Sequence, residues 1–577
     1  MKSPIAALIF ILVLCGLALF PLFSTPYFIA VHDQVQPERV SEMAGALQDG
    51  QLPPRFVENL GYGYGYPLFN FYAPLPYYVG AFFYNLGTDI ILSTKLMVAI
   101  GFVGAGISMF FAGSYLWGKR GGLIAAVVYT LAPYHAVQTY VRGSIGELYA
   151  YALLPLILIG LLELYKKQWR KRTVFIGIVA VALLSIAHTV SLYMLLYLSV
   201  LHIVISTIAL AVNKKDVVSH LQKQILFLVI PLAYACYFWL AAFLEIGLTQ
   251  LSLETGNDVN YTNHFVALSQ LWSSPWGFGG SAPGTQLDGM SFMIGKIGII
   301  LTLVTTLTLF IHKHAKNHQD KHKILGLGVL LLISLFHMLQ ESQFIWQLVP
   351  QFALIQFPWR FLTITNLAVA CLAGGSVIVL RMLPVKYNRD AVFALFPIII
   401  VFLLLFPFNL RDFPQTKYFK AQNQYLKTAS EITAKDHLRF DASKISDEFL
   451  PKDAVRPTDI TQVSQDQISC DAPCELKDTV FLSHIYKFTV QVSEKTTLYL
   501  DKVYFPDYTV TIDGQNQFIK KESPNTMSIT LEKGEHAVQF TLRDTPIRSL
   551  ANIITICAII STIGYYLMIK RNKIQER

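Results

Sequence analysis

Long apolar segments alternate with short polar connections along the chain, and this pattern predicts most of its elements. A membrane-spanning helix needs about 20 mainly apolar residues, and about twelve segments approach that length. They are Pro4–Leu22, Ile90–Trp117, Gly121–Tyr140, Leu148–Tyr165, Thr173–Thr189, Leu192–Val212, Ile225–Ile246, Phe292–Ile311, Ile324–Leu339, Phe361–Leu380, Ala391–Phe408 and Leu550–Ile569. Phe71–Leu86 is also apolar, but its prolines and aromatic residues favour an interfacial or re-entrant segment.

The first polar loop has a pattern of its own. A His32-Asp33 pair opens it, and apolar residues then recur at the i, i+3, i+4, i+7 spacing of an amphipathic helix. These apolar residues are Val40, Met43, Ala44 and Leu47. Pro37 suits the first turn of that helix and Gly50 suits its end. A run of Gly, Tyr and Pro follows, GYGYGYPLFNFYAPLPYY, which is too broken for a helix.

The polar stretch from Asn409 to Arg548 changes to the alternation of β-strands. The predicted strands are Tyr486–Val492, Thr497–Leu500, Tyr508–Ile512, Ser528–Leu531 and Ala537–Leu542, with turns at Asp513-Gly514 and Lys533-Gly534. The predicted fold is therefore an α-helical polytopic membrane protein of about 12 helices with a C-terminal antiparallel β-sandwich and a final membrane helix. The expected domains are 1–408, with a first outer loop at 23–89, then 409–548 for the sandwich and 549–577 for the last helix and a basic tail.

Composition supports a membrane protein. The 577 residues are 53% hydrophobic and 14% charged, whereas soluble domains carry about 25% charged residues. The net charge of +9 resides mostly in short clusters between apolar segments, which is typical of membrane topology and does not indicate nucleic-acid binding. Pro4–Leu22 has no convincing cleavage site and is interpreted as an uncleaved first helix.

The basic clusters predict the orientation in the membrane. They fall in alternate loops and share one face with Lys2 if the twelve-helix count holds, and that face is cytoplasmic. The clusters are Lys119-Arg120, Lys166 to Arg172, Lys214-Lys215, Lys313 to Lys323, Arg381 to Arg389 and Lys570-Arg571. Both termini are then cytoplasmic, and the first loop and the β-sandwich are extracytoplasmic. On that side a disulfide between Cys470 and Cys474 is plausible, and the sequence leaves its formation open.

Two acidic residues are the sharpest chemical candidates. Asp33, at the outer end of the first helix, suits a general base or a cation ligand, or else a solvated carboxylate at a helix end. Glu147 follows RGSIG in the first turn of a span, where the helix dipole favours an acid whatever its function. Arg142 lies five residues earlier and is a candidate partner.

Two further residues have a functional and a structural interpretation. His188, in AHTVS, is either a packing histidine or, with Asp33 and Glu147, part of a divalent-metal site. Arg360, in FPWRF, is either a fork of donors for a lipid phosphate or an interfacial residue that extends beside a Trp. The loop carrying Trp272, Trp276, Asp288 and Tyr261 suits a sugar or lipid headgroup, and equally a packed loop.

Several enzyme classes have no matching motif. The Gly277–Gly280 run has no GK[ST] or strand–GxGxxG–helix context, and no serine nucleophile elbow, HExxH or paired CxxC is present. From the residues alone, the chain is a multi-pass membrane protein with an outward polar site, either an enzyme or a transporter.

The motifs HDQVQPERV, GYGYPLFNFYAPLPYY, RGSIGE, AHTVS, YFWLAAFLE, SPWGFGG with DGMSF, and QFPWRF resemble a family of bacterial membrane proteins labelled "6-pyruvoyl-tetrahydropterin synthase-related". The chain has no soluble pterin-synthase domain, so that label does not guide the chemistry. The family is similar to a distant branch of the GT-C membrane glycosyltransferases, which place an acidic residue in the first outer loop and use polyprenyl-phosphate sugar donors.

The resemblance implies roles for individual residues. Asp33 would be the general base or position the acceptor, and Glu147 would be the second acid of the site. Substrate or donor-phosphate binding falls to His32, Arg55, Arg142, His188, Glu245 and Arg360. The first loop has a single His-Asp instead of an acidic pair, so the need for a divalent metal, with Asp33, Glu147 and His188 as candidate ligands, stays open.

Three functions are therefore weighed. The leading one is an inverting glycosyltransferase on the outer face of a bacterial cytoplasmic membrane. Its partners would be a polyprenyl-phosphate-linked sugar, membrane lipid, and a glycan, lipid or protein acceptor. The second is a transporter or flippase of lipid-linked glycans, which would want charged mid-membrane residues and broken helices in symmetric halves. The third is a non-catalytic envelope assembly protein.

Overall fold

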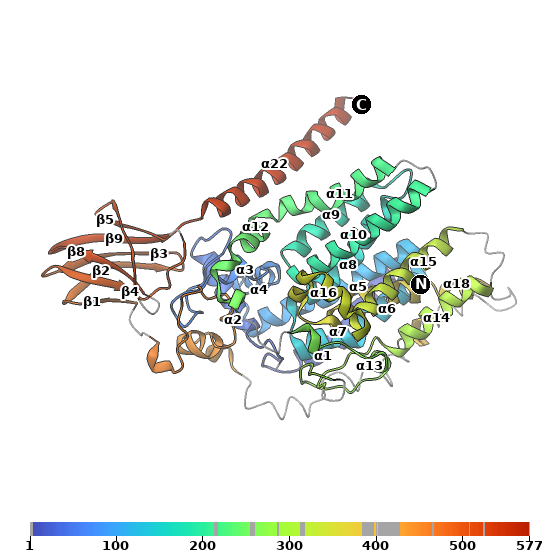
Figure 1. The fold of residues 1–577 in the computed structure, drawn as a ribbon, viewed down its shortest axis with the longest axis horizontal. Helices are drawn as coiled ribbons and strands as arrows, with labels where there is room; N and C mark the ends of the chain where they lie inside the picture. Colours follow the sequence, from blue (N-terminus) through green and yellow to red (C-terminus); the bar gives the residue numbers. More distant parts are fainter. Residues whose placement is uncertain are drawn as a thin grey trace. The chain divides into compact units, whose positions relative to one another are not determined.

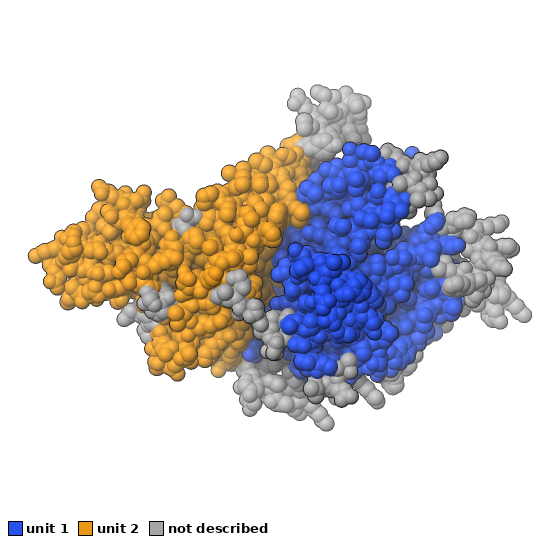
Figure 2. All heavy atoms as spheres, in the orientation of Figure 1, with its two compact units in different colours: residues 1–34, 95–231, 255–426 blue, residues 35–94, 232–254, 427–577 orange. Residues whose placement is uncertain are grey.

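The computed structural model describes residues 4–29, 31–212, 217–253, 260–284, 288–311, 318–382, 397–399, 401, 427–463, 467–506, 508–522 and 526–575. The chain divides into two compact units (Figure 2). Unit 1 comprises residues 1–34, 95–231 and 255–426, and unit 2 comprises residues 35–94, 232–254 and 427–577. Unit 2 thus combines the first polar loop with the C-terminal region, a grouping that the linear boundaries did not predict.

Unit 1 is built from helices and short helical turns (Figure 1). Its first half contains α1 (Pro4–Phe23), most of α5 (Ile90–Trp117), α6 (Lys119–Thr130), α7 (Pro133–Val137), η1 (Gln138–Arg142), α8 (Ile145–Glu163), α9 (Lys171–Ser185), α10 (Thr189–Val212) and most of α11 (Val217–Tyr234). Its second half contains η5 (Tyr261–Asn263), α13 (Leu268–Trp272), α14 (Lys296–Ile311), α15 (His318–Met338), η6 (Gln340–Ser342), α16 (Gln343–Leu348), η7 (Pro350–Ile355), η8 (Pro358–Phe361), α17 (Leu362–Gly374) and α18 (Val377–Met382).

Helix α17 lies at the centre of unit 1. All of its residues are buried, and it packs against α6, α14 and α15. The approach to α6 is close, because a Cβ atom added at Gly121 would lie 2.8 Å from the Gly374 carbonyl oxygen. Small residues allow such close contact between helices in a membrane. This packing brings the FPWRF segment, which leads into α17, into the interior of unit 1.

Eight of the described helical segments are long and apolar enough to cross a membrane. They are Pro4–Phe23, Ile90–Trp117, Ile145–Glu163, Thr189–Ile208, Val217–Tyr234, Asp320–Met338, Pro358–Val379 and Pro546–Gly564. The predicted count of about twelve is not confirmed. Three predicted spans form shorter helices, Ile225–Ile246 divides at Ala235, and Ala391–Phe408 lies almost wholly outside the described residues.

The predicted span Gly121–Tyr140 is divided for a clear reason. Helix α6 ends at Thr130, and Ala132 is extended with ψ 134° because the residue before a proline disfavours the helical conformation. Pro133 then starts α7, which continues as the π-helical η1 and ends at Gly143 in the left-handed region, with φ 63°. The RGSIGE segment follows this division, and α8 begins within it, at Ile145.

The helices of unit 2 include the predicted amphipathic helix. Helix α2 (Gln36–Gln48) buries Val40, Met43 and Ala44, Pro37 lies in its first turn, and Gly50 beyond its end has φ 83°. The Phe71–Leu86 segment forms no span. The remaining helices are α3 (Leu68–Phe71), α4 (Leu75–Asn85), α12 (Cys236–Glu245), η2 (Ile246–Leu248), η3 (Gln250–Leu253), α21 (Ala429–Ile432), η11 (His437–Ala442), η12 (Ile460–Gln462) and α22 (Pro546–Gln575).

The C-terminal region of unit 2 carries two antiparallel sheets, ordered β1-β4-β8-β7 and β2-β3-β9-β5-β6. The strands are β1 (Ile468–Cys470), β2 (Cys474–Leu482), β3 (Ile485–Val492), β4 (Thr496–Leu500), β5 (Tyr508–Ile512), β6 (Gln515–Gln517), β7 (Lys520–Glu522), β8 (Thr526–Leu531) and β9 (Gly534–Leu542). The five predicted strands are confirmed as β3, β4, β5, β8 and β9. The turn at Asp513-Gly514 has φ of 51° and 78°, which suits a two-residue hairpin.

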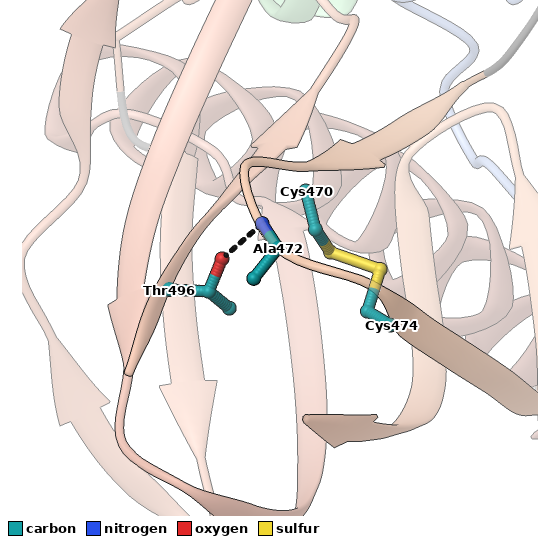
Figure 3. Close-up of a disulfide and its surroundings, with 4 residues drawn as sticks. All are labelled: Cys470, Ala472, Cys474 and Thr496. Atoms are coloured by element: carbon teal, nitrogen blue, oxygen red, sulfur yellow. Dashed lines mark hydrogen bonds between the residues drawn. A yellow bond between two sulfur atoms is a disulfide. The ribbon is translucent and has the colours of Figure 1, made fainter. Parts of the chain in front are cut away.

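A disulfide joins Cys470 to Cys474 (Figure 3). Cys470 ends β1 and Cys474 begins β2, and each strand is at the edge of a different sheet. The Ala472 amide between them donates a hydrogen bond to the Thr496 hydroxyl at 2.9 Å. The disulfide that the sequence left open is therefore present, and it connects the two sheets covalently.

Candidate functional site in unit 1

The His32-Asp33 pair lies against the start of the RGSIGE segment. The His32 amide donates to the Val141 carbonyl at 2.9 Å, and the Asp33 amide donates to the Arg142 carbonyl at 3.0 Å. The His32 ring makes a further hydrogen bond, from Nε2 to the Phe278 carbonyl at 2.7 Å. The backbone thus holds Asp33 next to Arg142.

Two glycines make this approach possible. A Cβ atom added at Gly143 would lie 2.4 Å from the Val31 side chain, and its left-handed φ already disfavours other residues. A Cβ atom added at Gly146 would lie 2.6 Å from the Ala187 carbonyl oxygen. The RGSIGE motif therefore serves as a junction where the first loop and the α9–α10 connection meet the start of α8.

Glu147 is the centre of a buried hydrogen-bond network. Its Oε2 atom accepts from Arg142 Nη1 at 2.5 Å and from the Ser144 hydroxyl at 3.4 Å. Its Oε1 atom accepts from the Tyr134 hydroxyl at 2.7 Å and from the Thr363 hydroxyl at 2.8 Å. Glu147 is 1% exposed, so nearly all of its interactions are with protein. A carboxylate with this many donors is fixed in place and is poorly suited to take up a proton.

Glu147, Tyr134 and the Trp359 ring stabilise the positive charge of Arg142. Burial by itself would lower the pKa of Arg142, but the Glu147 carboxylate and the Tyr134 phenol outweigh burial and raise that pKa. Burial and the Glu147 charge also hold the pKa of Tyr134 well above its usual value, so Tyr134 remains a donor. The Arg142 guanidinium lies 4.5 Å from the centre of the Trp359 ring, which stabilises its cation further.

His188 and Arg360 belong to the same electrostatic group. Burial, together with the charges of Arg360 and Arg142, lowers the pKa of His188 to about 3, although the Glu147 charge opposes the shift. His188 Nδ1 accepts from the Ser191 amide at 3.2 Å, as a neutral imidazole can. The Arg360 guanidinium donates to the Ile355 carbonyl at 2.9 Å and lies 5.1 Å from the Phe357 ring centre.

Unit 1 therefore brings together six of the predicted site residues, His32, Asp33, Arg142, Glu147, His188 and Arg360. Backbone hydrogen bonds hold His32 and Asp33 against the RGSIGE segment. A salt bridge joins Arg142 to Glu147, and the charges of these two residues and of Arg360 act on His188. Tyr134 and Thr363 were not predicted. Thr363 lies three residues after Arg360, so helical spacing from the FPWRF motif could have indicated that Thr363 faces the site. Tyr134 is 13 residues before Glu147, and no local pattern links the two.

Glu245 and Arg55 belong to unit 2 and form a separate ionic network. Glu245 accepts from Arg548 Nε at 2.9 Å, from the Asn70 amide at 3.0 Å and from the Thr545 hydroxyl at 2.6 Å. Arg55 Nε is 3.1 Å from the Asp544 carboxylate, and its Nη1 atom donates to the Asn70 amide oxygen at 3.0 Å. This network joins the first loop to α12 and to the start of α22.

A divalent metal at the predicted ligands does not fit the residues present. Both Glu147 oxygens already accept bonds, one of them from the cationic Arg142, which would repel a metal ion. Among the residues that the structure describes, no three His, Cys, Asp or Glu side chains are grouped to hold a metal.

Comparison with known proteins gives one family. A family model described as "6-pyruvoyl-tetrahydropterin synthase related domain; membrane protein" matches residues 69–410. An uncharacterized protein of Lactococcus lactis subsp. cremoris (strain MG1363) is 26% identical over 200 residues, which are 33% of this chain and 32% of that protein. The chain thus aligns with about a third of the length of this relative.

Solved structures similar to this chain include the oligosaccharyltransferase of Archaeoglobus fulgidus. Its apo form has a TM-score of 0.44 and 12% identity, with 79% of this chain and 61% of that chain covered. The complex of this enzyme, AglB, with an inhibitory peptide and a dolichol-phosphate has a TM-score of 0.42 and 12% identity, with 78% and 61% covered.

Proposed function

We infer a function on the premise that this chain belongs to the 6-pyruvoyl-tetrahydropterin synthase-related family of membrane proteins. We propose that it is an inverting membrane glycosyltransferase. It would transfer a sugar from a polyprenyl-phosphate donor to a glycan, lipid or protein acceptor on the outer face of a bacterial cytoplasmic membrane. The C-terminal sheets would form a β-sandwich on that outer face, where an oxidising compartment suits the Cys470–Cys474 disulfide.

The observation that supports this proposal most strongly is the position of Asp33. Its amide is bonded to the carbonyl of Arg142, and Arg142 in turn pairs with Glu147. An acidic residue is thus held, through its backbone, next to the cationic Arg142. Transfer from a lipid phosphate needs both, because a hydroxyl must lose its proton while a phosphate leaves with negative charge.

The proposed reaction assigns each part to a residue. The acceptor oxygen forms a bond to the anomeric carbon while the bond from that carbon to the phosphate oxygen breaks. Asp33 takes the acceptor proton, and polyprenyl phosphate leaves with the electron pair. The Arg360 guanidinium would bind the phosphate oxygens through paired donors. Attack opposite the leaving group inverts the anomeric centre.

Glu147 receives a positioning role in this scheme. Since Tyr134, Thr363 and Arg142 already donate to its two oxygens, it is a weak candidate for the base. It holds Arg142 in place, and Arg142 holds Asp33 through the backbone. His188, neutral because of its lowered pKa, would offer a hydrogen bond to the sugar without adding charge.

The donor class is tested with purified wild-type protein in detergent. Labelled polyprenyl-phosphate sugars and labelled nucleotide sugars are supplied separately with an envelope extract as acceptor. We expect label to move from the lipid donor alone, because the proposed chemistry releases a lipid phosphate. Absence of transfer from a lipid pool that a known glycosyltransferase can use would count against the proposal and favour a transport or assembly role.

A further inference from the structure

A second layer of polar side chains lies one helical turn from the Glu147 network. Three elements of unit 1 each supply a pair of residues separated by three or four positions, which places both members on one helix face. The pairs are His135 and Gln138 on α7–η1, Thr363 and Asn366 on α17, and Glu147 and Tyr151 on α8. The first member of the α17 and α8 pairs belongs to the network already described.

Contacts connect these residues into a ring. Gln138 Nε2 donates to the Thr363 hydroxyl at 3.2 Å, and Thr363 donates to Glu147. The His135 ring stacks on the Tyr151 ring with centroids 4.5 Å apart. The Tyr151 hydroxyl lies near the Asn366 side chain, and Asn366 follows Thr363 by one turn. His135, Gln138 and Asn366 therefore belong to one connected group of buried side chains on α7–η1, α8 and α17.

Four polar atoms in this group have no hydrogen-bond partner among the described residues. They are His135 Nε2, Gln138 Oε1 and both side-chain atoms of the Asn366 amide. The three residues are 0%, 0% and 2% exposed. Buried polar groups are nearly always hydrogen-bonded, to protein or to ordered water, so atoms gathered in this way point to a ligand.

The donors and acceptors define what that ligand must offer. His135 Nδ1 donates to the Thr130 carbonyl at 2.9 Å, so Nε2 of a neutral His135 is an acceptor. Gln138 Oε1 is a second acceptor, while the Asn366 amide supplies a donor and an acceptor. The Tyr151 proton goes to the Tyr129 carbonyl, so Tyr151 has only a lone pair to offer. None of the facing groups is a strong anion or cation apart from Glu147, whose oxygens are occupied.

We propose that His135, Gln138 and Asn366 form an internal water-binding site beneath Glu147. Water can donate to His135 Nε2 and Gln138 Oε1 while it accepts from Asn366 Nδ2, and it is a small, uncharged ligand, as these uncharged buried groups require. The bound water extends the hydrogen-bond chain from Glu147 through Thr363 and Gln138. It thereby fixes Thr363, and with it one oxygen of Glu147. This site does not depend on the proposed transferase activity.

The direct test is an experimental map of the wild-type protein at a resolution that shows ordered water. We expect separate peaks about 2.7–3.2 Å from His135 Nε2, Gln138 Oε1 and the Asn366 amide. Absence of peaks in a region where neighbouring side chains are well defined would overturn the proposal. Continuous elongated density, which would indicate a larger hydroxyl-bearing ligand, would overturn it as well.

A second test uses stability and needs no map. Asn366→Leu removes one wall of the site and leaves His135 and Gln138 without a bridge, so we expect an apparent Tm lower by about 2–4 °C. Leu367→Ile on the same helix, a buried apolar exchange, is the matched control. An Asn366→Leu protein as stable as wild type, or more stable, would show that the amide was unsatisfied and would overturn the proposal.

Coupling to Glu147 is measured with Thr363→Val alone and combined with Asn366→Leu. If water connects the two layers, the losses in Tm are less than additive, because each change breaks the same chain. Additive losses would contradict that connection, since two unrelated packing defects add.

Discussion

Glu147 and Arg142 show how a single pair organises the site. Both are buried, at 1% and 8% exposed, and removal of one charge leaves the other without compensation in a medium of low polarity. The stability cost of such a change is large, whereas an exposed ion pair contributes little. The pair therefore fixes the side chain of Arg142, whose backbone carbonyl accepts a hydrogen bond from the Asp33 amide.

The first prediction concerns that pair. Glu147→Gln should lower the free energy of unfolding by about 3–5 kcal/mol, because Arg142 is left buried and unpaired. Thermal or denaturant unfolding of the purified protein measures the change. Glu475→Gln, at a side chain that is 71% exposed, is the matched control and should have almost no effect. Equal stability of the two variants would contradict the buried-pair interpretation.

The second prediction follows from the pKa of His188, which burial lowers to about 3 from its usual 6.5. As pH falls from 6.5 towards 3, the unfolded chain takes up a proton at this residue and the folded protein does not, so folding loses stability. His188→Asn removes this dependence and keeps an acceptor for the Ser191 amide. We expect the Tm of the wild type to fall relative to that of the variant between pH 7 and pH 4. A constant difference would contradict the lowered pKa.

At the scale of elements, the RGSIGE junction matters more than any helix around it. Its glycines let three chain segments meet, and the π-helical η1 before it ends at Gly143. The sequence indicated Arg142 as a candidate partner of Glu147, since charged residues at the end of an apolar run are conspicuous, and the two form a salt bridge. The only sequence signal for the division of the predicted span Gly121–Tyr140 was Pro133. The apolar composition of the segment led to the prediction of one continuous helix instead.

The third prediction tests the junction. Gly146→Ala should destabilise the protein by about 1–3 kcal/mol, because the new methyl group would lie 2.6 Å from the Ala187 carbonyl and crowd His188. Gly16→Ala in α1, where nothing lies within 4 Å of the added atom, is the control and should be neutral or slightly stabilising. Unfolding midpoints of both variants, compared with wild type, decide the question. Similar midpoints for the two variants would refute the close approach.

The division of the chain into two units was the feature that the sequence predicted least well. Hydropathy predicted a membrane protein, and strand alternation predicted five strands. The grouping of residues 35–94 with residues 427–577 depends on long-range ionic contacts, such as Arg55 with Asp544 and Glu245 with Arg548. Such pairs are hundreds of residues apart, and no local pattern indicates them. Tyr134 is only 13 residues before Glu147, but it lies on a separate helical segment, so no helical spacing indicated it as a partner.

The fourth prediction concerns the membrane side of unit 2. If the β-sheets face an oxidising compartment, Cys470 and Cys474 should react with a membrane-impermeant maleimide on intact cells only after an impermeant reductant is added. The Cys470→Ser/Cys474→Ser double variant is the control and should show no reductant-dependent labelling. Labelling that requires cell lysis would place the sheets on the cytoplasmic side and contradict the orientation.

The most direct measurement of the central claim is the rate of sugar transfer from a polyprenyl-phosphate donor by Asp33→Asn. Asp453→Asn, at an exposed position of unit 2, is the matched control. If Asp33 is the base, its variant should lose transfer by about 10²–10⁴-fold, while its Tm and the rate of the control stay near wild type. Transfer at the wild-type rate by a folded Asp33→Asn protein would contradict the account and remove the assigned base.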